Sequence, residues 1–143
     1  MVPVEFNVHI FLGKFTMRGY DVRVAALAIG APAKWIDNLL SQHEIVEVAR
    51  ARRGVTRKIS FPALVHLAVT HELHDALGMG VRDALELSRA LLSSTQESAV
   101  PTGHLRIALD RNALEQTLNV RLRVALESAP TLRRGRPPRR HVR

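Results

Sequence analysis

The sequence predicts an α+β fold that is mainly helical, with a small strand-containing region built from its N-terminal and C-terminal segments. Two patterns lead to this expectation. Apolar residues recur at helical spacing from about residue 21 to residue 92, whereas they alternate with polar residues near both ends. The chain has 143 residues and no cysteine, so it can form one domain with a core that needs no disulfide bonds.

The first element expected is a strand over residues 4–12, VEFNVHIFL, within an N-terminal segment of residues 1–19. Its apolar residues share one face of the strand: Val4, Phe6, Val8, Ile10 and Leu12. His9 lies on the opposite face and is expected to be exposed.

Two short helices joined by a turn come next. The stretch DVRVAALAI ends at Gly30, and Pro32 marks the start of a second helix, AKWIDNLLS. Two short helices joined by about three residues that include a glycine form the helix-turn-helix pattern. Trp35, in the second helix, is expected to lie in the core or against the loop that follows, the alternative being a contact with DNA.

That loop, VARARRGVTRKISF at 48–61, holds five basic residues and no acidic one. Ser60 then caps a helix with Pro62 in its first turn and Gly78 at its end. The inward residues expected there are Leu64, Leu67, Ala68, Leu73 and Leu77. A further helix is expected from Val81 to Leu92, with Leu85 and Leu91 inward, and residues 93–104 read as a linker.

The C-terminal segment at 105–128 is expected to form a strand, a short helix and a second strand. Residues 105, 107 and 109 are apolar and alternate, and so do Val120, Leu122, Val124 and Leu126. Residues 111–118 form the helix between them, although RNALEQTLNVRLRVALES can equally form one long helix. We expect this region to hold a dimer or partner contact.

Positive charge is concentrated in the tail at 129–143. The formal net charge is +8, of which the six arginines after residue 130 contribute +6, leaving +2 for the other 130 residues. Such asymmetry is typical of contact with nucleic acid or an anionic surface. Solubility is the alternative, but it does not require clustering.

Residues 20–92 resemble the winged helix-turn-helix domain of the MerR family. Four residues fall at the spacings that the helix-turn-helix pattern favours: Ala26, Gly30, Ile36 and Leu39. The basic loop matches the wing of that family, TRKISF is similar to its "RxYS" segment, and LGMGV to its "LGFSL" turn. The resemblance implies a second helix that enters the major groove of DNA and a wing over the sugar-phosphate backbone.

The resemblance leaves five positions of the second helix facing outward: Ala33, Lys34, Asp37, Asn38 and Ser41. Asn38 can read adenine and Lys34 can reach guanine or phosphate, the alternative being ordinary exposed surface. A carboxylate at Asp37 repels phosphate unless it meets a cytosine amino group. In the wing, the expected phosphate contacts are Arg50, Arg52, Arg53, Arg57 and Lys58, the alternative being a solvated loop.

Arg134-Gly135-Arg136-Pro137 in the tail is similar to the core of an AT-hook. In such a segment Arg134 and Arg136 would lie in the narrow minor groove of A·T-rich DNA. The alternative is a basic tail that attracts polyanions without specificity.

Catalytic and metal chemistry are not expected. His71 and His74 are three residues apart, whereas the zinc-protease motif needs histidines at i and i+4, and no third ligand is evident. No phosphate-binding glycine loop and no nucleophile in a recognisable setting occurs, so we expect neither a cofactor nor enzymatic activity.

The sequence therefore predicts a cytoplasmic, nucleoid-associated regulator that binds double-stranded DNA, as a dimeric repressor without an effector domain. An antitoxin that neutralises a partner toxin and represses its own operon is one alternative. An architectural DNA-binding protein is another. A membrane location is not expected, because the longest apolar run, from Val24 to Ile29, is too short to span a bilayer.

Overall fold

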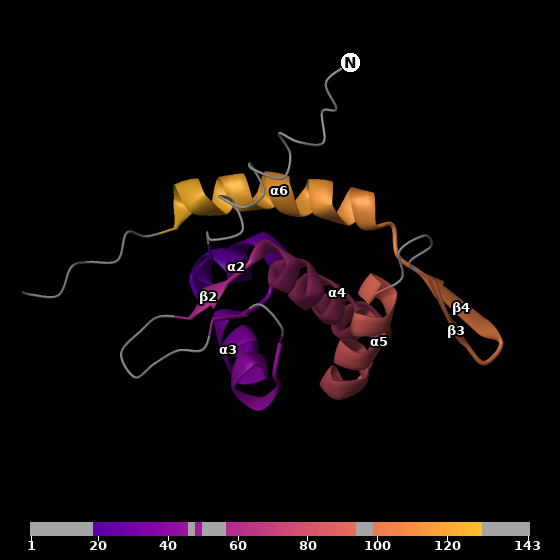
Figure 1. Ribbon diagram of the computed structural model, residues 1–143. Coiled ribbons are helices and arrows are strands. Elements are labelled where there is room, and N and C mark those ends of the chain that lie inside the picture. Colours follow the sequence, from indigo (N-terminus) through magenta and orange to yellow (C-terminus); the bar gives the residue numbers. More distant parts are fainter. Residues whose placement is uncertain (1–18, 46–47, 50–56, 94–98, 130–143) are drawn as a thin grey trace, which may run out of the picture.

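The computed structural model describes residues 19–45, 48–49, 57–93 and 99–129. Its elements are shown in Figure 1: α2 (Val22–Ile29), α3 (Ala33–Gln42), β1 (Val48–Ala49), β2 (Lys58–Ile59), α4 (Phe61–Leu77), α5 (Val81–Ser93), β3 (Ala99–Thr102), β4 (Leu105–Ala108) and α6 (Arg111–Ser128). A helix-rich α+β fold is thereby confirmed. The strand expected at 4–12 and the tail at 130–143 lie outside the described residues.

Local sequence signals fix the ends of α2 and the start of α3. The Asp21 carboxylate accepts a hydrogen bond from the Val24 amide at 2.8 Å, which caps the first turn of α2. Gly30 ends the helix in the left-handed region, with φ 79°, and its amide donates to the Ala26 carbonyl. Pro32 immediately precedes α3. The two helices and their turn are therefore where the sequence predicts them.

The long helix α4 also begins and ends as predicted. The Ser60 hydroxyl accepts a hydrogen bond from the Ala63 amide at 3.3 Å, and Gly78 ends the helix with φ 65°. Four of the five residues expected on the inward face are buried. The expectation is wrong for Leu77, which is 62% exposed because it lies in the last turn, beside an open groove.

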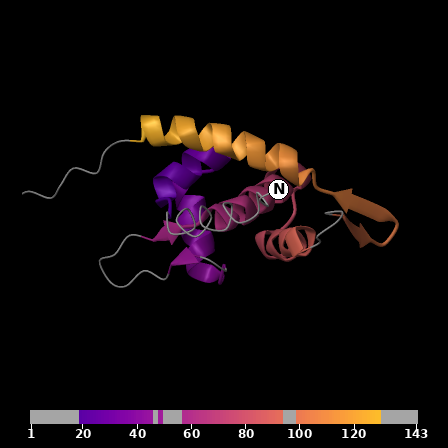
Figure 2. The same ribbon diagram turned by 45° about the horizontal axis from the view of Figure 1, so that its top comes forward.

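The C-terminal segment differs from the main expectation. Residues 111–128 form one helix, so the strand expected over Val120–Leu126 is wrong and the alternative of a single long helix is correct. Strand β4 confirms the strand expected to begin at Leu105, although Leu105 itself is exposed. Its partner β3 lies inside the stretch 93–104, so the expectation of a linker is wrong for Ala99–Thr102. The two strands form an antiparallel hairpin that extends away from the helices (Figures 1 and 2).

The main core is built around α2. Helix α6 lies across α2 on one side, and α3 and α4 pack against α2 as well (Figure 1). Ala25 and Ala28 have no exposed surface, and from α6 the buried residues are Leu118, Leu122 and Ala125. Small side chains in α2 let the neighbouring helices approach closely.

Strand β2 connects this core to two other segments. Ile59 is fully buried and lies opposite Val48 in the β1–β2 hairpin. On its other side, the Tyr20 amide donates to the Ile59 carbonyl at 2.7 Å and the Ile59 amide donates to the Tyr20 carbonyl at 2.8 Å. The hairpin is therefore attached to the residue that directly precedes the Asp21 cap of α2.

Helices α4 and α5 are joined by a buried polar cluster. The hydroxyls of Thr70 and Ser88, both fully buried, lie 3.0 Å apart, and the Thr70 hydroxyl is also within 2.8 Å of the His66 carbonyl. The His66 Nε2 donates to the Leu85 carbonyl at 3.3 Å, because a carbonyl oxygen can only accept. Each of these groups has a partner, so the cluster fixes the two helices relative to one another.

Stability should fall on acidification because of His66. Burial lowers the pKa of this imidazole below its ordinary value of 6.5, the Arg89 guanidinium lowers it further, and the bond to Leu85 opposes both. The unfolded chain therefore binds this proton more readily than the folded one. The contribution of His66 to stability is complete above pH 6.5 and is lost as the pH falls toward the folded pKa.

Thermal unfolding followed by circular dichroism at several pH values between about 8 and about 5 tests this. The melting temperature should drop toward the acidic end, and the drop should be smaller in His66→Gln, whose amide can still donate to the Leu85 carbonyl. An equal drop in both proteins would assign the pH dependence to other groups.

Candidate nucleic-acid interface

One face of α3 is polar and open. Ile36 and Leu39 are buried and hold this helix on the core. On the opposite face the side chains are exposed as predicted: Lys34, Asp37, Asn38 and Ser41. The fifth position expected to face outward, Ala33, is half-buried. Pro32, the N-cap residue of α3, offers no side-chain hydrogen bond and the first turn of the helix holds no acidic residue, so this end is electropositive.

Arg57 attaches the β1–β2 hairpin to the same helix. Its guanidinium donates to the Asp37 carbonyl at 3.3 Å and to the Ser41 hydroxyl at 3.2 Å. The Ser41 hydroxyl in turn donates to the Asp37 carbonyl at 2.7 Å. Arg57 was expected to contact phosphate only. It also holds the base of the hairpin beside the exposed end of α3, and a guanidinium has five N–H groups, so some remain for an anion.

Lys58, the next residue, is exposed on β2, where it lies opposite Ala49. Because successive strand residues point to opposite faces, burial of Ile59 directs Lys58 outward. The described residues thus bring Lys34 on α3, Arg57 and Lys58 into one unit of helix and hairpin. Arg50, Arg52 and Arg53 lie outside the described residues, as do Arg134 and Arg136.

Trp35 joins α3 to α4. It is half-buried, with its ring centroid 5.0 Å from that of His71 in an edge contact and 6.1 Å from that of His74 in a stacked one. The His74 Nδ1 donates to the Met79 carbonyl at 2.7 Å, which fixes the orientation of this ring. Trp35 packs against the core, as expected, while residues 50–56 of the basic loop lie outside the described residues.

The two histidines on α4 are therefore packing partners of an aromatic ring. Among the residues that the structure describes, no group of three histidine, cysteine or acidic side chains is arranged to hold a metal ion.

The Arg57–Ser41 contact could not be found from the sequence, because it joins residues 16 positions apart in a loop and a helix. The sequence of the basic loop indicated a concentration of positive charge, but not that the guanidinium of Arg57 forms hydrogen bonds with α3. A groove between α4, α6 and β4 was also missed, since three segments distant in sequence form it.

No family model, no curated protein and no solved structure matches the chain significantly. None of the helices that the structure describes has the length and apolar character needed to cross a bilayer.

Replacing Trp35 with alanine should destabilise the fold by about 2 kcal/mol, less than for a fully buried aromatic residue, because the ring is only half-buried. Urea unfolding followed by circular dichroism measures this. Asn38→Ala, an exposed position on the same helix, is the control and should change the free energy of unfolding by less than about 0.5 kcal/mol. Equal effects of the two substitutions would contradict a packing role for Trp35.

Proposed function

We propose that the protein is a dimeric regulator that binds double-stranded DNA through a winged helix-turn-helix domain. Helix α3 is the recognition helix and the β1–β2 hairpin is the base of the wing. The observation that carries the proposal is the bonding of Arg57 to α3, which holds a basic hairpin next to the exposed face of a short helix. A winged domain needs this pairing, because the helix reads base edges while the hairpin contacts phosphates.

The chemistry of the α3 face supports base reading. Lys34 and Asn38 are four residues apart and therefore lie on one side of the helix, near its N-terminal half. An asparagine amide can form paired hydrogen bonds with adenine, and a lysine can bond to guanine or phosphate. The uncapped N-terminus of α3 adds a positive end that attracts phosphate.

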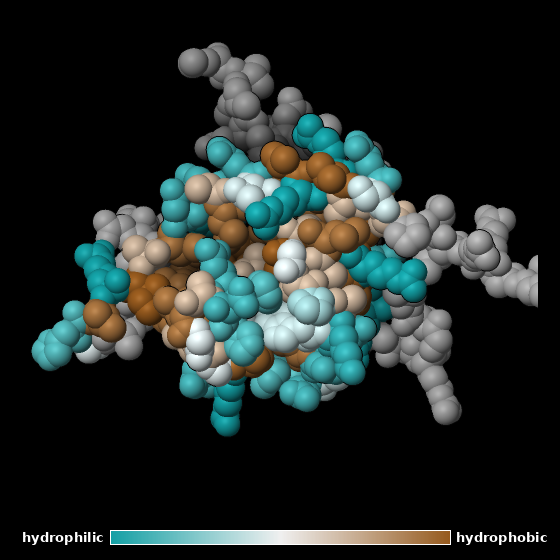
Figure 3. Space-filling view, turned by 180° about the vertical axis from the view of Figure 1, so that it is seen from behind, coloured by the Kyte–Doolittle hydropathy of each residue, from teal (hydrophilic) through white to brown (hydrophobic). Residues whose placement is uncertain are grey.

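Dimerisation through α6 is the second part of the proposal. Val120 and Val124 are 62% and 57% exposed, and they lie four residues apart, away from the buried face of the helix. Together with Leu27 of α2, which is 53% exposed, they line an apolar hollow of about 370 Å³. Figure 3 shows apolar residues among hydrophilic ones at the top of the molecule, where α6 lies.

A second copy of the chain is the partner that suits this surface. One short recognition helix discriminates little between DNA sequences, so two copies that read two half-sites are needed for a specific operator. Exposed apolar side chains that converge from two helices are typical of such a contact.

DNA binding can be tested by fluorescence anisotropy with two duplexes, the DNA upstream of the protein's own gene and a shuffled sequence of equal composition. The full chain and a version that ends at Pro130 should both prefer the upstream duplex. In Lys34→Ala and Lys58→Ala, affinity should fall, and the slope of log K against log salt should decrease by about one for each phosphate that the variant no longer neutralises.

Arg111→Ala is the matched control, because it removes a cation from α6, on the opposite side of the molecule from α3 (Figure 1). It should leave binding almost unchanged. Equal affinity for both duplexes, largely abolished in the version that ends at Pro130, would overturn specific reading by α3 and favour an architectural, tail-driven DNA-binding protein.

The dimer can be tested by sedimentation velocity with two charge substitutions on α6. Val124→Glu should shift the protein toward the monomer, because a desolvated carboxylate in an apolar contact is costly. Leu126→Glu is the control, since Leu126 is equally exposed, at 56% against 57%, but lies on another face of the helix. Loss of the dimer in both variants, or in neither, would contradict a contact through Val120 and Val124.

A further inference from the structure

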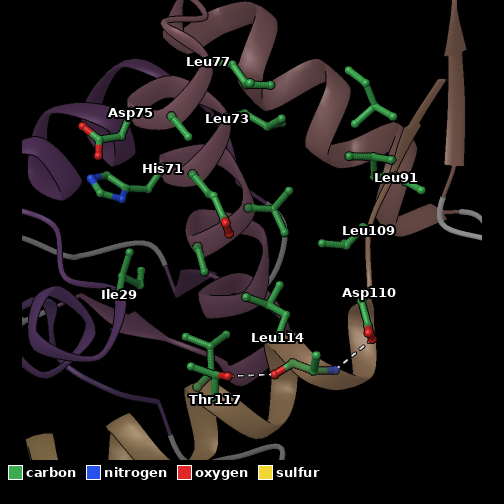
Figure 4. A pocket seen from close by; sticks show the side chains of 18 of the residues that line it. Ile29, His71, Leu73, Asp75, Leu77, Leu91, Leu109, Asp110, Leu114 and Thr117 are labelled. Atoms are coloured by element: carbon green, nitrogen blue, oxygen red, sulfur yellow. Dashed lines mark hydrogen bonds between the residues drawn. The ribbon is translucent and has the colours of Figure 1, made fainter. Parts of the chain in front are cut away.

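A groove of about 750 Å³ runs between α4, α6 and β4 (Figure 4). Its floor is apolar and includes Leu73, Leu91, Leu114 and Leu118. It exists because the N-terminal half of α6 extends past α2 and over the C-terminal half of α4.

The rim of the groove is acidic. Three carboxylates line it, from Glu72 and Asp75 on α4 and Asp110 at the start of α6, against one cation, Arg121. Asp110 already has one partner, because its carboxylate accepts a hydrogen bond from the Ala113 amide at 3.0 Å and so caps α6. Glu72 and Asp75 are exposed and form neither a hydrogen bond nor an ion pair within the part of the chain that the structure describes.

We propose that this groove binds the arginine-rich C-terminal segment of the same chain, residues 130–143. An arginine side chain suits both parts of the site. Its aliphatic stem can cover the apolar floor, while its guanidinium pairs with a carboxylate of the rim. The segment carries six arginines and no acidic residue, which complements the excess of acidic groups around the groove.

The geometry of the chain permits this contact. The segment begins after Ala129, directly beyond the helix that forms one wall of the groove. Helix α6 is about 27 Å long, and fourteen extended residues reach up to about 46 Å. Because it is covalently attached, the segment is present near the groove at an effective concentration of about millimolar, far above that of a free cationic partner.

The contact does not depend on the proposed function, so it is tested without DNA. If the protein does bind DNA, its own acidic groove and the minor groove of the DNA compete for the arginines of residues 130–143. Failure of the docking experiment would leave the DNA-binding experiment unaffected.

Because the chain has no cysteine, Val142→Cys introduces a single site for a nitroxide spin label in the full-length protein. In a ¹⁵N correlation spectrum at low salt, the label should weaken the amide signals of residues 71–77 and 107–118. The signals of the β1–β2 hairpin, which lies at the opposite end of α4, should be weakened far less. Salt at about 1 M shortens the Debye length to about 3 Å and should restore the weakened signals.

The decisive variant is Glu72→Gln/Asp75→Asn in the labelled protein, which should restore the groove signals at low salt. Asp83→Asn/Glu86→Gln is the matched control. It removes two exposed carboxylates from α5 that do not line the groove, and should preserve the broadening. Spectra of both variants with the label reduced show whether the fold is retained.

Broadening that is uniform over the protein, or centred on any surface other than the groove, would overturn the proposal. Broadening at the groove that survives Glu72→Gln/Asp75→Asn would also overturn it, because pairing with these carboxylates is the stated cause.

Discussion

The close packing of α2 is the constraint on which the rest of the structure depends. This helix has eight residues, yet α3, α4 and α6 all pack against it. Such sharing is possible because Ala25 and Ala28, which have no exposed surface, keep the helix narrow. A larger side chain at either position would force a neighbouring helix outward. Since α6 covers one side of α2 and α3 lies on the other, the same packing separates the polar face of α3 from the exposed Val120 and Val124 of α6 (Figure 2).

The parts of the fold that follow local rules could be predicted from the sequence. Asp21 and Ser60 cap helices through their own side chains, and Gly30 and Gly78 end helices in a backbone conformation that glycine adopts without strain. These signals act over a few residues, so tertiary structure does not alter them. The exposed positions of α3 followed from the same periodicity, because burial of Ile36 directs the residues of the opposite face outward.

The error at the C-terminus arose from a helix with apolar residues on more than one face. Val120, Leu122, Val124 and Leu126 alternate like a strand, but in a helix they point in different directions. Leu122 faces α2 and is 4% exposed, whereas the other three are more than half exposed. The three exposed apolar residues, together with the buried Leu122, therefore occupy every second position of the sequence, which imitates the pattern of a strand. Contacts between distant residues, such as Arg57 with Ser41, leave no periodic signal at all.

The 130 residues that precede the basic tail have a net charge of only +2, but in the folded structure their charges are separated between two surfaces. Lys34 on α3 lies with Arg57 and Lys58 at the base of the hairpin, where Asp37 is the acidic residue of the helix, while three carboxylates and one cation, Arg121, line the groove. The two surfaces share one packed contact, because His71 lines the groove and its ring also touches Trp35 of α3. Trp35 thus packs between the helix that carries Lys34 and Asn38 and the C-terminal half of α4, where it touches both His71 and His74.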